Sequence, residues 1–467
     1  MHILICQWGL AVRTIWAEQA LLATGWAGNV RLGIGDDGRI GAVETGAAPE
    51  ADDYRVGALL PAPANLHSHA FQRAMAGMTE RRGPHGRDTF WTWRQLMFRF
   101  LDALTPDDIE AITGFVQMEM LEAGYAAVAE FHYVHHQPDG TPYGDLGELS
   151  ARIGAAAETS GIGLTLLPVL YQYGGCDGAP LAPGQIRFGN DIDRFAALHQ
   201  RAAAIVGTLP ADTGLGVAPH SLRAVNREGL GAALTLADCQ PLHMHLAEQV
   251  AEVEEVLDAY GQRPVDWLLD HHAVDDRWCL IHCTQMTEDE TVRLARTGAV
   301  AGLCPITESS LGDGIFNAVT YRDAGGRFGI GSDSNIRITL SEELRTLEYS
   351  QRLRDRLRAV LATDAASTGR VLFSGAVQGG AQALQRQSGA LAEGNWADLL
   401  ALETTSVDLE GRMGDALLDS FIFAGDDRMI GDVWSAGRHL VREGRHLRRD
   451  AIAARYRQTM ASLKDRI

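Results

Sequence analysis

The sequence predicts an α/β fold, a TIM-type (β/α)₈ barrel with a small β domain attached. Three observations favour it: short apolar runs alternate with helix-like segments, there are eight such runs from residue 58 onward, and metal-binding residue types follow several of them. In such a barrel the catalytic groups lie at the carboxyl ends of the strands, whereas an open doubly wound sheet would bind ligands at one switch point. The expected strands are 58–66, 126–133, 162–171, 213–220, 241–246, 278–283, 299–304 and 327–332.

The segments between these runs carry helix start and stop signals. Thr105 precedes Pro106 and two acidic residues, which is typical of a helix N-terminus, and Gly124 follows as a stop. The segment from Thr287 to Gly298 repeats this pattern. We therefore expect helices between the strands, as βα units require.

The two ends of the chain differ from this pattern. Residues 13–57 contain a hairpin-like stretch with the turn sequence GDDGRI, and residues 394–448 are typical of further short strands. Neither end is large enough for a robust core alone, so we expect one small β-sandwich domain built from both termini. The expected division is 1–60 and 386–448 for the two parts of this domain, 61–385 for the barrel and 449–467 for a C-terminal helix.

A long segment without strong periodicity, residues 70–104, follows the first expected strand and contains Trp91, Trp93 and Arg94. Segments of this length more often have a function than serve only as a connection. Two interpretations stay open here: a lid over the barrel mouth, or a contact between the subunits of a dimer.

Composition restricts the class of partner. The formal net charge of −19 argues against nucleic acid, because phosphate binding requires a basic surface, and an anionic ligand would need local arginines. The six cysteines have no disulfide-like spacing, which is typical of reduced thiols in a cytoplasmic protein. The apolar residues 1–13 lack a basic region and a clear cleavage site and are too short to cross a membrane. We expect a cytoplasmic enzyme without nucleic-acid or membrane partners.

Metal-ligand types stand at the ends of three expected strands. His67 and His69 form a His-x-His pair whose rings point to one strand face, His245 follows the fifth strand, and Asp333 the eighth. Three nitrogens and a carboxylate suit Zn²⁺ with an open position for water, and Fe²⁺ or Mn²⁺ would fit too. His243 competes with His245, because both lie on the same face of the strand.

Glu248 lies three residues after His245, where the strand gives way to its loop. A carboxylate there can shuttle the proton of a metal-bound water, and this spacing favours His245 over His243 as the ligand. Considered without its neighbours, Glu248 would be interpreted as an acidic residue at the N-terminus of the following helix rather than as a catalytic carboxylate. We expect His282, at the end of strand six, to orient the water or polarise the bond under attack, and Asp333 to accept a proton as well as bind the metal.

Lys464 is the only lysine in the chain. Barrel hydrolases with two bridged metals often use a carboxylated lysine on strand four as the bridge. A lysine at the far end of the chain cannot fill that position, so we expect one metal per chain.

These features resemble the amidohydrolase superfamily, in its mononuclear deaminase branch: HSH, H-x-x-E, a histidine after strand six, SD-N and a terminal β domain. The segments HSHAFQRAMAG, FWTWR, EFHYVHH, APHSLRAV, CPITESSLGDGIF and GSDSNIRI are most similar to the bacterial formimidoylglutamate deiminases. The resemblance implies conversion of N-formimidoyl-L-glutamate to N-formyl-L-glutamate and ammonia in histidine degradation, and a homodimer. It also implies a substrate pocket formed by Gln72, Arg94, Tyr133, His220 and Arg223. The two arginines suit an anionic substrate, because guanidinium groups bind carboxylates bidentately.

Two other functions stay open. A nucleobase deaminase such as guanine deaminase shares the metal shell, and Trp91 and Trp93 are compatible with a pocket that stacks a ring. A metal-free amidohydrolase-like scaffold would be recognised by lost ligands, and none is lost from this sequence.

Overall fold

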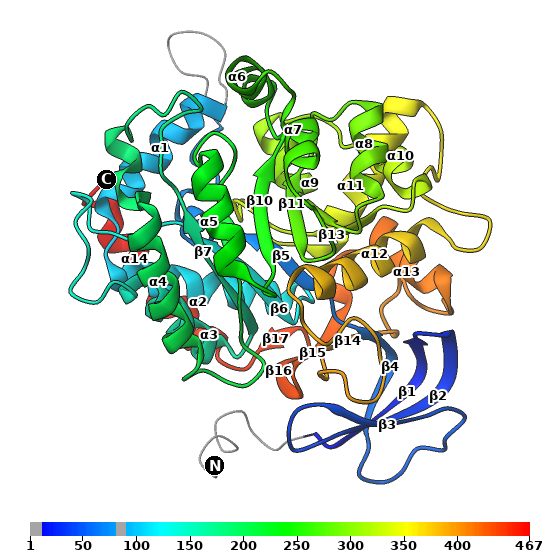
Figure 1. Cartoon of the computed structure of the whole chain (residues 1–467). Helices are drawn as coiled ribbons and strands as arrows, with labels where there is room; N and C mark the ends of the chain where they lie inside the picture. The colour runs from blue at the N-terminus through cyan, green and yellow to red at the C-terminus, as the bar shows by residue number, and fades with distance from the viewer. Residues whose placement is uncertain (1–11, 81–89) are drawn as a thin grey trace.

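The computed structural model describes residues 12–80 and 90–467, and only the backbone of residues 90–92. Parallel strands form a barrel in the middle of the molecule with helices around it (Figure 1), which confirms the predicted barrel. Its strands are β5 (Ala64–Ser68), β6 (Ala127–His132), β7 (Gly163–Leu170), β8 (Gly214–Leu215) with β9 (Ala218–Pro219) in the fourth position, β10 (Leu242–Leu246), β11 (Trp278–His282), β12 (Val300–Leu303) and β13 (Arg327–Ile330). Single parallel bridges, Ser68 with Asp333 and Val217 with Leu242, join the two groups of strands into a ring.

The barrel strands are buried on both faces. Every residue of β6, β7, β10 and β11 is buried. Helices cover one face of such strands and interior side chains fill the other, so the sequence carries continuous apolar runs rather than an alternating pattern.

The helices begin and end largely where the capping signals predict. Thr105 and Thr287 each form a capping box, with Asp108 and Glu290 respectively, so the buried N–H groups of the first turn have acceptors. The helices are α1 (Phe90–Ala103), α2 (Pro106–Glu122), α3 (Glu148–Ser160), α4 (Ile192–Val206), α5 (Arg227–Ala237), α6 (Val250–Tyr260), α7 (Pro264–His271), α8 (Glu288–Ala295), α9 (Pro305–Leu311), α10 (Ala318–Asp323), α11 (Leu340–Asp355), α12 (Thr368–Ala383), α13 (Asp415–Phe423) and α14 (Arg449–Lys464), with the 3-10 helices η1 (Ala70–Met75), η2 (Pro183–Phe188) and η3 (Asp427–Met429).

The two ends of the chain combine into one eight-stranded sheet, as predicted, in the order β17-β16-β15-β14-β4-β1-β2-β3. A separate apolar cluster, including Ile15, Val30 and Trp434, forms its core. The strands are β1 (Thr14–Leu22), β2 (Gly25–Ile34), β3 (Ile40–Glu44), β4 (Tyr54–Pro61), β14 (Leu399–Leu402), β15 (Ile430–Ser435), β16 (Arg438–Arg442) and β17 (Arg445–His446).

The predicted first barrel strand, 58–66, is wrong as a single element. Residues up to Pro61 belong to β4 of the small sheet, and the barrel begins at Ala64. Pro61 and Pro63 lack an N–H group and cannot donate to a strand ladder, so the chain leaves one sheet and enters the other between them.

The segment 70–104 also has more structure than its sequence indicates. It contains η1 and the fourteen-residue helix α1, while residues 81–89, between them, lie outside the described residues. Among the helices of residues 12–80 and 90–467, none has the length and apolar character needed to cross a membrane.

Candidate active site

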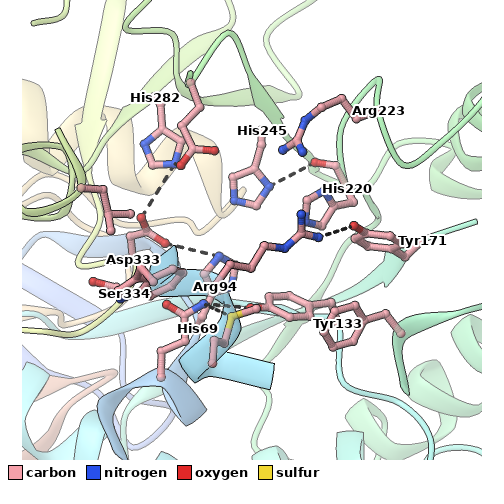
Figure 2. A pocket seen from close by; sticks show the side chains of 16 residues that line it. His69, Arg94, Tyr133, Tyr171, His220, Arg223, His245, His282, Asp333 and Ser334 are labelled. Carbon is pink, nitrogen blue, oxygen red and sulfur yellow. Dashed lines mark hydrogen bonds and ion pairs between the residues drawn. The ribbon is translucent and has the colours of Figure 1, made fainter. Parts of the chain in front are cut away.

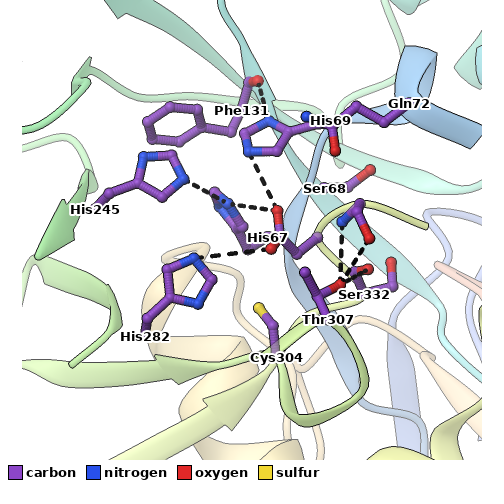
Figure 3. A network of polar contacts seen from close by, with 12 residues as sticks. His67, Ser68, His69, Gln72, Phe131, His245, His282, Cys304, Thr307 and Ser332 are labelled. Carbon is purple, nitrogen blue, oxygen red and sulfur yellow. Dashed lines mark hydrogen bonds and ion pairs between the residues drawn. The ribbon is translucent and has the colours of Figure 1, made fainter. Parts of the chain in front are cut away.

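The residues predicted as metal ligands converge at the carboxyl end of the barrel (Figure 3). The Nε2 atoms of His67 and His245 lie 3.1 Å apart, and Asp333 Oδ1 lies 3.5 Å from His67 Nε2 and 3.3 Å from His69 Nε2. All four side chains are buried. Three strands that are distant in the sequence therefore bring four candidate ligand residues, three histidines and one aspartate, to one point.

Hydrogen bonds fix the orientation of two of these rings. His69 Nδ1 lies 3.1 Å from the carbonyl oxygen of Phe131, and His245 Nδ1 lies 3.1 Å from that of His220. A carbonyl can only accept, so each Nδ1 carries the hydrogen and, in the neutral ring, each Nε2 presents a lone pair to the cluster. Burial lowers the pKa of His69 and holds that of His245 well below its ordinary value, which favours the neutral rings.

The cluster has the electronic character of a cation site. The lone pair of His69 Nε2 faces a carboxylate oxygen of Asp333 at 3.3 Å, and two electron-rich atoms at that distance repel each other unless a cation lies between them. Neutral imidazoles with one carboxylate are the donor set that Zn²⁺ prefers. The described residues therefore fit a divalent metal.

His243, the competitor of His245, lies elsewhere in the barrel. Its Nε2 lies 2.7 Å from the carbonyl oxygen of Ala383, at the end of α12, whereas the three-histidine cluster consists of His67, His69 and His245. Residues two apart on one strand face the same side at different depths, and only the upper one reaches the barrel mouth.

A polar network holds the two strand ends that carry the ligands. The backbone N–H groups of Ser332 and Asp333 donate to the carbonyl of His67 at 3.1 and 2.9 Å. Ser332 Oγ also accepts from Asn65 Nδ2 at 2.6 Å and donates to Asn335 Oδ1 at 2.6 Å. The SD-N motif thus fixes the end of β13 against the end of β5 (Figure 3).

Glu248 and His282 lie beside this cluster. His282 Nε2 is 3.8 Å from both Glu248 Oε1 and Asp333 Oδ2, and its Nδ1 is 3.3 Å from Glu308 Oε1. Burial raises the pKa of Glu248 to about 7. Burial lowers the pKa of His282, but Glu248, Glu308 and Asp333 outweigh it and raise that pKa well above its ordinary value. A carboxyl group and an imidazole with such perturbed pKa values are suited to proton transfer.

The backbone at these positions is strained. His282 and Asp333 have φ angles of 71° and 46°, and Ala247, directly before Glu248, has 52°. Positive φ in non-glycine residues costs about 1–3 kcal/mol each and persists where the surrounding structure enforces it. The strand ends are turned so that their side chains point into the mouth of the barrel.

A pocket opens over the cluster (Figure 2). All five residues that the resemblance implied line it, together with His69, His245, Glu248, His282 and Asp333. Gln72 Nε2 donates to the hydroxyl of Tyr133 at 2.8 Å. The further lining residues are Trp93, Met97, Tyr171, Phe188, Leu311 and Ser334.

Two polar residues of the site, Tyr171 and Glu308, were not predicted from the sequence. Tyr171 follows directly on β7, and its position at a strand end was a signal that could have found it. Glu308, which contacts His282, lies inside α9 and carries no such signal. The segment 70–104 contributes to the pocket through α1, from which Trp93, Arg94 and Met97 reach the lining.

Comparison with known proteins identifies the class. The model of the amidohydrolase family matches residues 58–440, and that of the N-terminal domain of formimidoylglutamate deiminase HutF matches residues 12–57. The chain therefore belongs to the amidohydrolase family.

Within this family, the formimidoylglutamate deiminase of Pseudomonas aeruginosa is 49% identical over 97% of this chain and 99% of its own length. The 8-oxoguanine deaminase of the same organism is 28% identical over 92% of this chain and 94% of its own length. The crystal structure of an amidohydrolase from Brucella melitensis has a TM-score of 0.93 at 48% identity and covers 97% of this chain and 99% of that one.

Proposed function

We propose that this protein hydrolyses N-formimidoyl-L-glutamate to N-formyl-L-glutamate and ammonia in histidine degradation, with one Zn²⁺ held by His67, His69, His245 and Asp333. The observation that carries the proposal is that two arginines, Arg94 and Arg223, line the same pocket as the metal cluster. The relative that shares about half of the residues over nearly the whole chain has the same activity in its name.

The metal proposal is supported by the donor chemistry of the cluster. When bound there, the ion would supply the Lewis acidity that activates a water for attack on the formimidoyl carbon. Fe²⁺ and Mn²⁺ would fit the same ligands. One ion per chain is expected, because the chain has no lysine for a bridge on strand four.

Proton transfer falls to the carboxyl group of Glu248. With a pKa of about 7 it can carry the two protons of the attacking water, one after the other, to the departing nitrogen. The C–N bond then breaks, ammonia leaves, and the oxygen of the water becomes the carbonyl oxygen of the product. His282, whose Nδ1 contacts Glu308, points its Nε2 toward Glu248 and Asp333 and orients the water between them. Asp333 accepts a hydrogen bond from the same water.

The pocket side chains bind the glutamate part. We assign the carboxylates to Arg94 and Arg223, and the polar atoms near the formimidoyl group to Gln72, Tyr133 and His220. The side-chain oxygen of Gln72 is buried without a hydrogen-bond partner among the described residues, which suits an acceptor for an N–H of the substrate. A nucleobase would offer these guanidinium groups no carboxylate, so we place guanine deaminase second. The homodimer and the cytoplasmic location stay predictions.

Arg223→Met tests the substrate assignment. Loss of a charged hydrogen-bond partner costs about 1.5–3 kcal/mol, so the KM for N-formimidoyl-L-glutamate should rise by roughly ten- to a hundred-fold. Arg227→Met is a matched control, because Arg227 lies over the Trp267 ring and lines the neighbouring groove rather than the active-site pocket. An uncharged formamidine should be a poor substrate and insensitive to either change. Equal KM values for wild type and Arg223→Met would contradict the assignment.

A further inference from the structure

The hydroxyl group of Tyr171 lies in the wall of the active-site pocket next to Arg94 (Figure 2), and the proposed mechanism gives it no part. The residue is 2% exposed and directly follows β7. Its ring lies against that of His220, with the centroids 4.5 Å apart. The hydroxyl is therefore held within the group of side chains that would surround the substrate.

Two neighbours donate hydrogen bonds to this hydroxyl. Gln185 Oε1 accepts the backbone N–H of Ala182 at 2.9 Å, so its amide is oriented with Nε2 toward Tyr171, where it donates at 2.8 Å. Arg94 Nη2 donates to the same oxygen at 2.9 Å. A guanidinium group has no acceptor atom, and the Gln185 oxygen faces Ala182 rather than Tyr171, so neither neighbour receives the hydrogen of Tyr171.

The hydrogen of Tyr171 therefore requires a third partner. A hydroxyl group can accept two hydrogen bonds and donate one. The Tyr171 oxygen already accepts two, from Arg94 and Gln185. Among the described atoms of the chain no acceptor takes the hydroxyl hydrogen, and the hydroxyl lines the pocket. Because the hydroxyl lines the pocket, a molecule bound there can supply this acceptor.

We propose that Tyr171 is a substrate-binding residue that donates its O–H to a carboxylate of the substrate, and that Gln185 is the positioning residue that directs it. This inference rests on the proposed function. The O–H of Tyr171 and the guanidinium of Arg94 form a pair of donors side by side. Hydrogen bonds to an ionised acceptor are about twice as strong as neutral ones, so a carboxylate is the partner that this pair binds best.

Tyr171→Phe removes the hydroxyl and keeps the ring. We expect the KM for N-formimidoyl-L-glutamate to rise by roughly ten-fold or more with a much smaller change in kcat, because the lost bond holds the substrate away from the reacting carbon. Tyr173→Phe is the matched control: it makes the same chemical change two residues further along, and Tyr173 lines the neighbouring groove. A KM for Tyr171→Phe equal to that of the control overturns the proposal.

The Arg94→Met background separates direct binding from an effect through Arg94. If Tyr171 contacts the substrate, Tyr171→Phe should weaken binding further in that background. If it only positions Arg94, the second change should cost nothing there, and the proposal falls.

Calorimetric titration of the metal-loaded protein with glutarate, a plain dicarboxylate, makes the test independent of turnover. Weaker glutarate binding by Tyr171→Phe supports the proposed contact between Tyr171 and a substrate carboxylate. This holds even if wild type fails to turn over N-formimidoyl-L-glutamate, because that failure would remove only the proposed function. Equal glutarate binding by wild type and Tyr171→Phe overturns the proposed contact between Tyr171 and a carboxylate.

Discussion

Glu248 carries the proton transfer in this account. Glu248→Gln is nearly isosteric and leaves the four proposed ligands in place, so the variant should keep its metal and lose roughly 10²–10⁴ in kcat. Elemental analysis and steady-state rates measure the two effects separately. Glu254→Gln, an exposed acid on α6, is the control and should be neutral. Near-normal turnover by Glu248→Gln would contradict the catalytic role and leave Glu248 as an acidic residue at the N-terminus of a helix.

Single residues were predictable where their role follows from strand geometry. His67, His69 and Asp333 stand at strand ends, and parallel strands in a closed barrel bring their carboxyl ends to one rim. Glu308 was not predicted as a site residue although it lies in the segment CPITESSLGDGIF, because it reaches His282 from inside a helix rather than from the end of a strand. The positive φ angles of His282 and Asp333 were equally hidden, since tertiary contacts impose them against the preference of the residues.

At the scale of elements, the sequence predicted most strands but not where two sheets meet. The apolar run 58–66 is continuous, and periodicity cannot reveal that its two halves pair with different neighbours. Helix α1 was missed although its apolar residues gather on one side, because this pattern extends over only fourteen residues of the long segment 70–104.

The short helix η2 holds α1 in place through a buried arginine. Arg187 is 1% exposed, and its guanidinium donates to the carbonyl oxygens of Leu101 and Leu104, the latter at 3.1 Å, near the C-terminal end of α1. It also donates to the carbonyl of His136 at 2.8 Å. The carbonyl of Leu101 also accepts the backbone N–H of Leu104 at 3.3 Å, so Arg187 adds a second donor there and supplies a donor to Leu104, directly after α1.

Arg187→Met should loosen α1, because each buried carbonyl left unpaired costs about 1–3 kcal/mol. Hydrogen exchange by mass spectrometry should show faster exchange in α1, with α8 on the other side of the barrel unchanged. Arg194→Met, a more exposed arginine on α4, serves as the control. Unchanged protection of α1 in Arg187→Met would show that Arg187 does not hold this helix.

At the scale of the whole molecule, a buried ion network joins the barrel to the small sheet. Asp212 lies 3.0 Å from Arg386 Nη2 and 2.7 Å from Arg438 Nη2 on β16, while Arg386 Nε lies 2.6 Å from Asp398, just before β14. Burial opposes the charge of Asp212, but the two arginines outweigh it and hold its pKa well below the ordinary value. The network therefore stabilises the folded chain while Asp212 is ionised.

This gives a pH-dependent prediction. A carboxyl group whose pKa is lowered by folding stabilises the protein above its unfolded pKa of about 3.9, and that contribution is lost as the pH falls further. Asp212→Asn should lower the thermal unfolding midpoint at pH 7. The difference between the midpoints of wild type and variant should become smaller below about pH 4. Breaking one partner of a buried pair costs about 3–5 kcal/mol, whereas Asp145→Asn, at a more exposed pair with Arg201, should have little effect. A gap that is the same at all pH values would contradict the assignment.

The central claim, deamination of a linear dicarboxylate formimidoyl substrate, is tested most directly by product analysis with the metal-loaded protein. Wild type should convert N-formimidoyl-L-glutamate to equimolar ammonia and N-formyl-L-glutamate, leave guanine unchanged, and lose activity when the metal is chelated. Ammonia released from guanine, with N-formimidoyl-L-glutamate recovered intact, would contradict the account and keep only the barrel and its metal site.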